Sequence, residues 1–224
     1  MKKFDQNEAE VYDQSIANKV PGYEETLKIL ALKASAEVPQ NGRVLVLGAG
    51  TGAEIFILGN LRSDISFVAV DYSKEMLDQI VIKNTQRVEP LKIEIHCSSI
   101  NEFTSSDLFD GIFCILTLHF LDVESKAGVF QLAYRLLKDH GSMWTYDLME
   151  FLAEEKIREE REFLEWCYRR NLSPIHIEKL IEGLRSKFLP VTEGATHSFS
   201  IKAGFQSMNS VSSFPRFRGY ENRK

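Results

Sequence analysis

Cysteine is scarce in this chain and is never clustered. Cys97, Cys114 and Cys167 are the only three among 224 residues, and none belongs to a Cys-x-x-Cys pair. This spacing argues against a disulfide framework and a thiolate zinc site, and it suits a reducing environment. The histidines also lack a metal-ligand spacing such as His-Glu-x-x-His. We therefore expect a cytoplasmic protein that binds no metal.

Long apolar runs and an excess of positive charge are also missing. No apolar run reaches the roughly 18 residues that suggest a membrane span, and residues 1–6 turn polar too early for a signal peptide. The net charge is −5, whereas proteins that bind long stretches of nucleic acid carry a basic surface. Neither a membrane nor nucleic acid is the expected partner. We interpret the local basic residues as solvated helix-end and tail charges: Arg169, Arg170, Arg216, Arg218, Arg223 and Lys224.

The chain does have an apolar run that leads into a glycine-rich turn. Residues 44–47 are followed by Gly48-x-Gly50-x-Gly52, and a second apolar run at 67–70 ends in Asp71. This pattern predicts a buried strand, a tight turn and the start of a helix. Glycine lets the backbone approach a ligand closely, and an acid at the tip of the next strand can accept hydrogen bonds from a ribose. The pattern thus predicts a nucleoside-binding site.

Two cofactors fit this outline. Gly48-x-Gly50-x-x-Ala53 formally satisfies the dinucleotide fingerprint, but the chain has no evident partner residues for hydride transfer. Gly-x-Gly-x-Gly, with Gly52 as its third glycine, resembles instead the first motif of the class I S-adenosylmethionine-dependent methyltransferases. A nicotinamide oxidoreductase is therefore the more distant alternative.

Three later segments resemble further motifs of that family, in the expected order. Residues 67–77 are similar to the second motif, whose acid, here Asp71, holds the ribose hydroxyls. Residues 98–103 are similar to the third, which brackets the adenine, and residues 109–121 to the fourth. The resemblance spans roughly residues 40–148. It implies S-adenosylmethionine as the cofactor, S-adenosylhomocysteine as the product, and binding by Leu47, Gly48, Ala49, Gly50, Thr51, Gly52, Asp71, Tyr72, Met76, Ser99, Ile100, Thr117, Tyr12 and Tyr23.

Two positions depart from the family pattern. Val46 stands where the family often has an acid that helps to organise the methionine end of the cofactor. Ser99 stands where the third motif has an acid, and a hydroxyl accepts a hydrogen bond more weakly than a carboxylate. We expect a working but plainer cofactor pocket.

The remaining pattern predicts a doubly wound α/β fold, with a mostly parallel, Rossmann-like seven-stranded sheet and helices on both faces. Strands alternate with helical stretches, which favours parallel pairing. We expect helices between the first five strands. The carboxyl ends of these parallel strands then lie at one edge of the sheet, and the four residues near those ends meet there: Gly48, Asp71, Ser99 and Thr117. The predicted strands are 43–48, 66–71, 92–97, 110–117, 142–148, 205–211 and 214–221.

The whole chain, 1–224, is predicted to form a single domain. Residues 1–40 form an N-terminal helical cap with a break at Pro21-Gly22, and 41–148 form the cofactor-binding core. Residues 149–200 form a helical cover or lid, and 201–224 a C-terminal hairpin. The charged stretch 154–162 has opposite charges at i,i+4, which predicts a solvated face.

A narrower resemblance involves the N-terminal run Phe4-Asp5-x-x-x-Ala9-x-x-Tyr12-Asp13, followed by residues 20–23. Together with residues 116–121 it is similar to the carboxy-S-adenosylmethionine synthases, which serve tRNA wobble-uridine modification. Those enzymes transfer a carboxyl carbon from prephenate onto the cofactor. They hold the new carboxylate with an arginine shortly before an Ala-Gly-Phe, here residues 203–205. This chain has Phe199 in that region, with His197 or Lys202 as alternative cations.

Methyl transfer requires mainly that the acceptor be positioned and water excluded, because the cofactor supplies the activation. His119 is the candidate general base, since it follows the fourth strand at the predicted site edge. A packed or capping histidine is the alternative.

Three functions follow from these observations. The first is an enzyme that methylates a small, mostly apolar or aromatic acceptor. The second is a carboxy-S-adenosylmethionine synthase-like enzyme, and the third is a non-catalytic protein that binds the cofactor or a partner. The oligomeric state is left open between monomer and homodimer.

Overall fold

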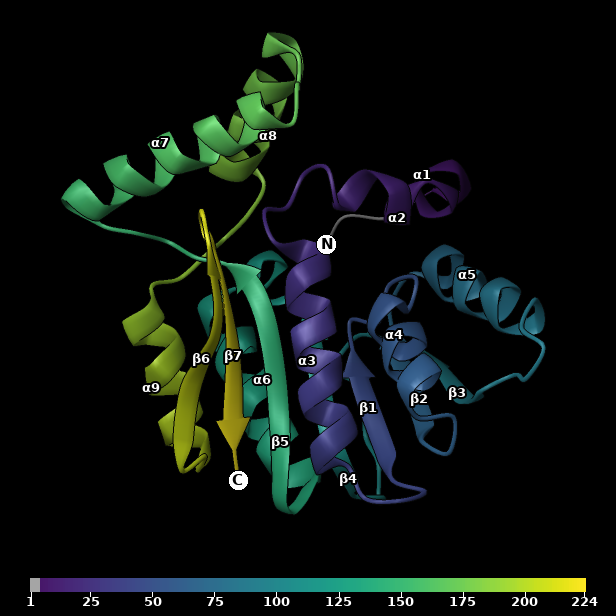
Figure 1. Cartoon of the computed structure of the whole chain (residues 1–224). Coiled ribbons are helices and arrows are strands. Elements are labelled where there is room, and N and C mark those ends of the chain that lie inside the picture. The colour runs from purple at the N-terminus through teal and green to yellow at the C-terminus, as the bar shows by residue number, and fades with distance from the viewer. Residues whose placement is uncertain (1–4) are drawn as a thin grey trace.

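A twisted seven-stranded sheet forms the centre of the protein (Figure 1). The computed structural model describes residues 5–224, and for Arg185 it describes the backbone alone. Phe4, part of the N-terminal pattern, thus lies outside the described residues. The strand order is β3-β2-β1-β4-β5-β7-β6, and β7 runs opposite to the direction that the other six strands share. The strands are β1 (Arg43–Leu47), β2 (Ser66–Asp71), β3 (Lys92–Cys97), β4 (Phe109–Ile115), β5 (Leu137–Leu148), β6 (Ser207–Phe214) and β7 (Phe217–Arg223).

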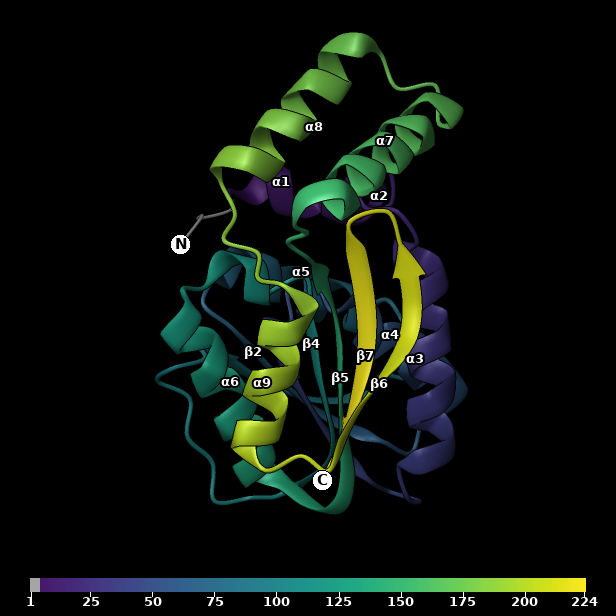
Figure 2. The ribbon, with the colours of Figure 1, turned by 90° about the vertical axis from the view of Figure 1, so that its left-hand side faces the viewer.

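Helices cover both faces of this sheet, as the sequence predicts. Figure 2 shows α6 and α9 on one side of the strands and α3 and α4 on the other. The helices are α1 (Gln6–Glu10), α2 (Tyr12–Ile16), α3 (Tyr23–Glu37), α4 (Ala53–Leu61), α5 (Lys74–Thr85), α6 (Val123–Leu136), α7 (Ala153–Arg169), α8 (Pro174–Ser186) and α9 (Glu193–Ala203), with a short 3-10 helix, η1 (Leu118–Phe120).

The alternating side chains of β1 explain why both faces are covered. Val44 and Val46 belong to one buried cluster, which includes α3, α4 and α5 residues. Leu45 and Leu47 belong to the other, which includes α6 residues. A strand that is apolar on both sides is stable only between two layers, since each face must be removed from water. The continuous apolar run of β1 therefore determines the three-layer arrangement.

Strands β1 to β4 lie within two residues of their predicted bounds. Strand β5 begins at Leu137 rather than at residue 142, because Leu137 pairs with Phe109 of β4. The C-terminal hairpin is displaced as well. The bounds of β2 and β3 match the prediction, whereas β6 and β7 begin two and three residues later than expected. The reason lies at the two turns. Gly204 ends α9 in a left-handed conformation with φ +115°, and the hairpin turns at Pro215-Arg216, where φ of Arg216 is +65°. Proline cannot donate to the β-ladder, so the turn forms there rather than near residue 212.

The prediction of a helix in every interval between the first five strands is wrong for one interval. No helix forms between β3 and β4. Residues 98–108 instead make a loop in which Ile100 and Phe103 bury their side chains and the Ser105 hydroxyl accepts a hydrogen bond from the Asp107 N–H at 3.0 Å. Serine and aspartate compete with helical hydrogen bonding in this way, which favours a turn.

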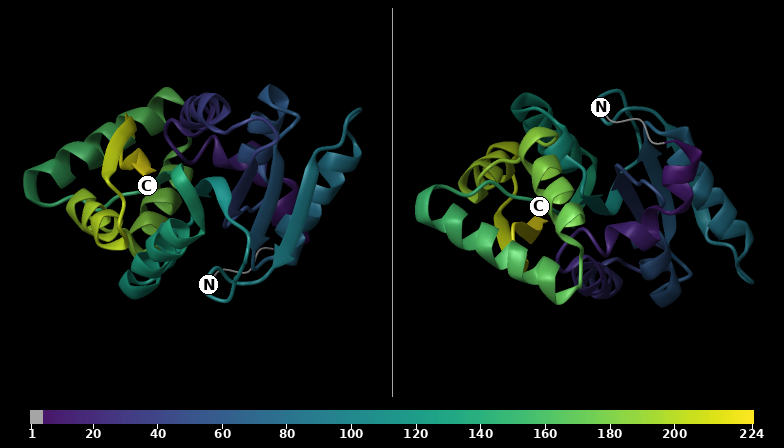
Figure 3. Two further views of the ribbon diagram at one scale, coloured as in Figure 1. Left: turned by 90° about the horizontal axis from the view of Figure 1, so that it is seen from below. Right: turned by 90° about the horizontal axis from the view of Figure 1, so that it is seen from above.

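Helices α7 and α8 project beyond the carboxyl edge of the sheet as a helical hairpin, which we call the α7–α8 arm (residues 153–186). Viewed from above in Figure 3, the arm lies over the β5–β7 half of the molecule, beside the N-terminal helices and away from α5. Phe163, Cys167, Ile177 and Leu184 are its buried apolar residues. Helix α9 does not belong to this arm, because it packs against α6 on the body.

The charged stretch 154–162, in α7, contains one buried acid and is therefore not the fully solvated face that the sequence predicts. Glu159 is only 3 % exposed. Its carboxylate accepts hydrogen bonds from the Arg216 N–H at 2.7 Å and from the Arg218 guanidinium at 2.5 Å. The interpretation of Arg216 and Arg218 as solvated tail charges is therefore wrong, since both are largely buried here. Because a lone charge would be costly inside the protein, the pair ties the arm to the β6–β7 hairpin.

The two ends of the arm are joined at its base. Met149 and Val191 form an isolated β-bridge, and the Glu150 N–H donates to the Val191 carbonyl at 3.0 Å. The Leu189 N–H donates to the His119 carbonyl at 2.7 Å. The chain therefore leaves the body and returns to it at neighbouring positions, next to η1.

Replacing Glu159 with glutamine should destabilise the protein. We expect Glu159→Gln to lower the free energy of unfolding by about 3 kcal/mol, because the Arg218 guanidinium stays buried without its counter-ion. Urea denaturation followed by circular dichroism measures this difference. Glu155→Gln, on the exposed side of the same helix, is the matched control and should change stability by less than about 0.5 kcal/mol. Equal effects of the two substitutions would contradict the anchoring role.

Candidate functional site

The loop between β1 and α4 is shaped by three glycines in left-handed conformations. The φ angles are +70° at Gly48, +51° at Gly50 and +76° at Gly52. The N–H groups of Gly48 and Ala49 both donate to the Val70 carbonyl, at 2.8 and 3.0 Å. These bonds fold the loop back over the end of β2, a path that only glycine follows without strain.

The middle of this loop faces open space, whereas its first glycine is packed. A Cβ atom on Gly48 would lie 2.2 Å from the Thr117 hydroxyl oxygen. A Cβ atom on Gly50 would meet only the terminal methyl group of Met76, at 4.0 Å. Gly50 thus presents bare backbone to a cleft, which is the cradle that a nucleoside cofactor requires.

Asp71 ends β2 and fixes the loop from the other side. Its Oδ2 accepts the Gly50 N–H at 2.9 Å, and its Oδ1 accepts the Ser73 N–H at 2.8 Å. Burial raises the pKa of Asp71, and these backbone N–H groups oppose that rise. One carboxylate therefore positions both the glycine loop and the start of α5. The lone pairs that these bonds leave unused are available to ligand hydroxyl groups.

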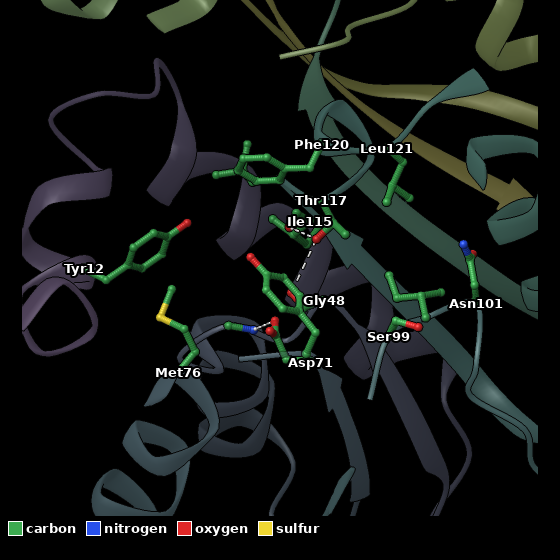
Figure 4. Close-up of a pocket in the computed structure, with 14 residues that line it drawn as sticks. Tyr12, Gly48, Asp71, Met76, Ser99, Asn101, Ile115, Thr117, Phe120 and Leu121 are labelled. Atoms are coloured by element: carbon green, nitrogen blue, oxygen red, sulfur yellow. Dashed lines mark hydrogen bonds between the residues drawn. The ribbon is translucent and has the colours of Figure 1, made fainter. Parts of the chain in front are cut away.

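Together these groups line a cleft at the carboxyl edge of the sheet (Figure 4). It encloses roughly 690 Å³, a volume that includes open solvent. The structure brings the following residues of the predicted site together on its wall: Tyr12, Gly48, Gly50, Asp71, Tyr72, Met76, Ser99, Ile100 and Thr117.

The other predicted cofactor residues lie behind this wall. Leu47 and Ala49 are buried, and Gly52 caps the N-terminus of α4. The Thr51 hydroxyl donates to Asp13 Oδ1 at 2.5 Å. Tyr23 is buried at the start of α3. These residues shape the loop and its backing, and direct contact with a ligand stays a prediction for them.

His119, the predicted base, also lies away from the cleft wall. It is 6 % exposed, and its Nδ1 lies 2.5 Å from Asp147 Oδ1. Its ring contacts Phe120 and Phe188, with centroid distances of 4.2 and 4.6 Å. It borders instead a second, smaller cavity beside Lys126 and Arg218. The geometry favours the alternative of a packed histidine.

Asp147 is a structural residue of this region that the sequence reasoning missed. Its Oδ2 accepts the N–H groups of Thr117 and Leu118 at 3.0 and 2.7 Å, and its Oδ1 accepts that of Leu148 at 2.7 Å. The carboxylate thereby holds the turn after β4, which carries the Thr117 side of the cleft. A signal was present in the sequence, because Asp147 lies one residue before the end of β5, much as Asp71 ends β2.

The cleft wall also contains residues that the sequence analysis did not select. Their common feature is that most are apolar: Asn101, Ile115, Leu116, Phe120 and Leu121. Among the described residues that line the cleft there is no lysine, arginine or histidine. This part of the described wall is thus mostly apolar and offers no cation to an anionic group.

Residues 197–202, the segment in which the resemblance implies a cation, do not line the cleft. Phe199 is partly buried and packs against the core near Phe130, with ring centroids 6.1 Å apart. His197 and Lys202 are exposed on α9, and neither lines the cleft. The proposed alternatives to the arginine are therefore not at the site, because α9 lies along α6.

Two further searches of the described residues give negative results. No group of three or more histidine, cysteine, aspartate or glutamate side chains among residues 5–224 is arranged to hold a metal ion. Within the same part of the chain, no helix combines the length and apolarity of a membrane span.

Comparison with known proteins identifies the core of the chain. Residues 44–141 match the family described as a methyltransferase domain. The carboxy-S-adenosyl-L-methionine synthase of Campylobacter lari is 23 % identical over 224 residues, covering 97 % of this chain and 92 % of that protein. The enzyme of the same name from Campylobacter concisus is 25 % identical over 219 residues, with the same coverage.

Solved structures show the same fold at low identity. Human N-acetylserotonin methyltransferase, in complex with S-adenosylmethionine, superposes with a TM-score of 0.67 at 14 % identity, covering 98 % of this chain and 56 % of that one. Magnesium protoporphyrin IX methyltransferase from Synechocystis gives 0.62 at 12 % identity, covering 91 % and 80 %. Residues 44–141 therefore resemble a methyltransferase domain, the chain shares its fold with these methyltransferases, and its sequence is similar to the carboxy-S-adenosylmethionine synthases over most of its length.

Proposed function

We propose that the protein is an enzyme that uses S-adenosylmethionine to methylate a small, mostly apolar or aromatic acceptor. The observation that carries this proposal is the composition of the cleft. A glycine cradle and a fixed carboxylate form its cofactor side, and mostly apolar side chains, with no cation among the described lining residues, form the rest. Such a site favours an uncharged acceptor, because a buried anion would stay uncompensated.

Each group of cleft residues would have its own role in binding the cofactor and the acceptor. Asp71 would hold the ribose hydroxyls, and Ser99 and Ile100 would border the adenine. Tyr12, Phe120 and Leu121 would exclude water from the reacting atoms. The bound cofactor would supply an activated methyl group on a sulfonium centre. Thr117, held by Asp147, would fix the floor of the site.

The acceptor is expected to react without a general base from the protein. Among the described residues of the cleft wall, the only titratable groups are Asp71, Tyr12 and Tyr72. Asp71 is engaged by backbone N–H groups, and burial raises the pKa of Tyr72 to about 12. This favours nucleophiles that are neutral near pH 7 and react without first losing a proton.

Carboxy-S-adenosylmethionine synthesis is the second candidate. The similarity to enzymes of that name over 97 % of the chain supports it. The reaction would place a new carboxylate near the cofactor, and the described cleft wall provides no cation to receive it. Methyl transfer is therefore our first proposal.

A test of product masses separates the candidates. The purified protein is incubated with S-adenosylmethionine and a panel of small acceptors, and with S-adenosylmethionine and prephenate. A methylated acceptor together with S-adenosylhomocysteine supports methyl transfer, while a prephenate-dependent gain in cofactor mass supports the second candidate and overturns the first. If neither product forms although the cofactor binds, the non-catalytic alternative is favoured. We further propose a cytoplasmic monomer or homodimer.

Asp71→Ala should abolish cofactor binding. The substitution removes both lone pairs for the ribose and the anchor of Gly50, so we expect the affinity for S-adenosylhomocysteine to fall by about 100-fold or more. Isothermal titration calorimetry measures the affinity, and a thermal unfolding curve checks that the variant is folded. Glu89→Gln, an exposed position elsewhere, serves as the control. Unchanged affinity in Asp71→Ala would refute the assignment of the cofactor site.

A pair of glycine substitutions should separate binding from folding. Gly50→Ala meets little protein but fills the cradle, so it should eliminate cofactor binding at a stability cost of about 1 kcal/mol from its positive φ. Gly48→Ala collides with Thr117 and should cost about 3 kcal/mol or more. Calorimetry and urea denaturation of both variants give the two quantities. Retained binding in folded Gly50→Ala would place the ligand elsewhere.

A further inference from the structure

The N-terminal segment reaches the cleft although it buries few apolar side chains. Residues 5–20, which we call the strap, contain the short helices α1 and α2 (Figure 1). Within the strap only Ala9 and Val20 are buried, although α1 packs against α5. Tyr12 nevertheless lies on the cleft wall, and in Figure 4 its ring points into the cleft from the side opposite Ser99. Since so little apolar surface is buried, other contacts have to hold the strap at the cleft.

The C-terminal end of the strap is fixed to the body of the protein. The Tyr146 hydroxyl, on β5, donates a hydrogen bond to the Pro21 carbonyl. Gly22 has a φ of +70° and is packed so closely that a Cβ atom there would lie 2.1 Å from a ring carbon of Phe214. Helix α3 then begins at the buried Tyr23. Any movement of the strap therefore takes place on the N-terminal side of Pro21.

A second attachment of the strap is polar and centres on Asp13. Its Oδ1 accepts a hydrogen bond from the Thr51 hydroxyl at 2.5 Å, and its Oδ2 pairs with the Lys83 ammonium group. Lys83, on α5, also donates to the Thr51 carbonyl at 2.9 Å. We call these three residues the latch: Asp13, Thr51 and Lys83. The latch joins the strap to both the glycine loop and α5.

The latch is accessible to solvent. The side chains of Asp13 and Lys83 are 43 % and 28 % exposed. Ion pairs at such positions stabilise a structure only modestly, and salt weakens them further because ions screen the charges. The hydrogen bond from the Thr51 hydroxyl to the carboxylate adds to this attachment. Contacts of this strength keep a segment closed most of the time and still permit it to open.

We propose that the strap opens to let the cofactor enter and leave the cleft, and that Asp13 is the residue that latches it closed. The inference rests on the proposed occupation of the cleft by S-adenosylmethionine. Tyr12 shares the cleft wall with Gly50 and Asp71, so the position of the strap controls access to the space beside them. All groups of the latch belong to the chain itself, and the latch can therefore form with or without a bound cofactor. Asp13 is thus a positioning residue that governs the rate of cofactor exchange more than the affinity.

Surface plasmon resonance of S-adenosylhomocysteine on the immobilised protein measures the two rate constants of binding. Asp13→Asn should raise both the association and the dissociation rate constant by about tenfold and leave the dissociation constant within about threefold, because an unlatched strap is open more often. Lys83→Met should act in the same direction. The double variant should show less than the product of the two effects, since both residues belong to one latch. Raising KCl from about 50 to about 500 mM should speed both steps in the unaltered protein and in neither variant.

Asp78→Asn is the matched control. It removes the exposed ion pair between Lys74 and Asp78 on the same helix, α5, and should leave both rate constants unchanged. Hydrogen exchange followed by mass spectrometry adds a readout that needs no ligand. The amides of residues 5–20 should exchange faster in Asp13→Asn than in Asp78→Asn, while circular dichroism shows that both variants are folded.

Three results would contradict the latch. Faster dissociation of Asp13→Asn without faster association would make Asp13 a contact of the bound state alone. Unchanged rate constants, or equal exchange of residues 5–20 in the two variants, would show that Asp13 does not hold the strap. Each of these results leaves the cofactor site intact. If S-adenosylhomocysteine does not bind the unaltered protein, the cofactor site fails and this inference fails with it.

Discussion

The carboxylate of Asp71 is the constraint on which the site depends. It accepts N–H groups from the glycine loop on one side and from the start of α5 on the other. A glycine-rich loop has little intrinsic preference for one backbone conformation, and the hydrogen bonds of Asp71 stabilise the one that the structure shows. The same strand end supplies the Val70 carbonyl that holds Gly48 and Ala49. The shape of the cradle is therefore set by β2, although its residues follow β1.

Asp147 repeats this arrangement on the opposite side of the cleft. Asp71 organises the turn after β1 and Asp147 organises the turn after β4, each from the end of the neighbouring strand. Parallel strands bring their carboxyl ends to one edge, so the turn of one strand lies next to the last residue of its neighbour. An acid at that residue can satisfy backbone N–H groups that would otherwise be left without partners.

The parts of this protein that sequence alone predicts well are those governed by local patterns. Apolar runs located β1 to β4 closely, and the glycine spacing located the cleft. Strands β6 and β7 begin later than predicted because the hairpin turns at Pro215. Whether a proline interrupts a β-ladder depends on the strand that pairs with it, which the local sequence does not show. The position of His119 depended on how η1 packs against Phe188, some seventy residues away in sequence. Glu159 was misjudged for a similar reason, because its partners Arg216 and Arg218 follow only after the arm has returned to the body.

The bridge between Met149 and Val191 brings the two ends of the α7–α8 arm together at the base of the arm. A segment whose ends already touch can be lengthened, shortened or exchanged without altering the order of the strands beneath it. The cofactor half and the arm are thus free to diverge at different rates. Proteins that share this sheet could differ in the arm alone, while β1, β2 and their glycine loop stay as they are.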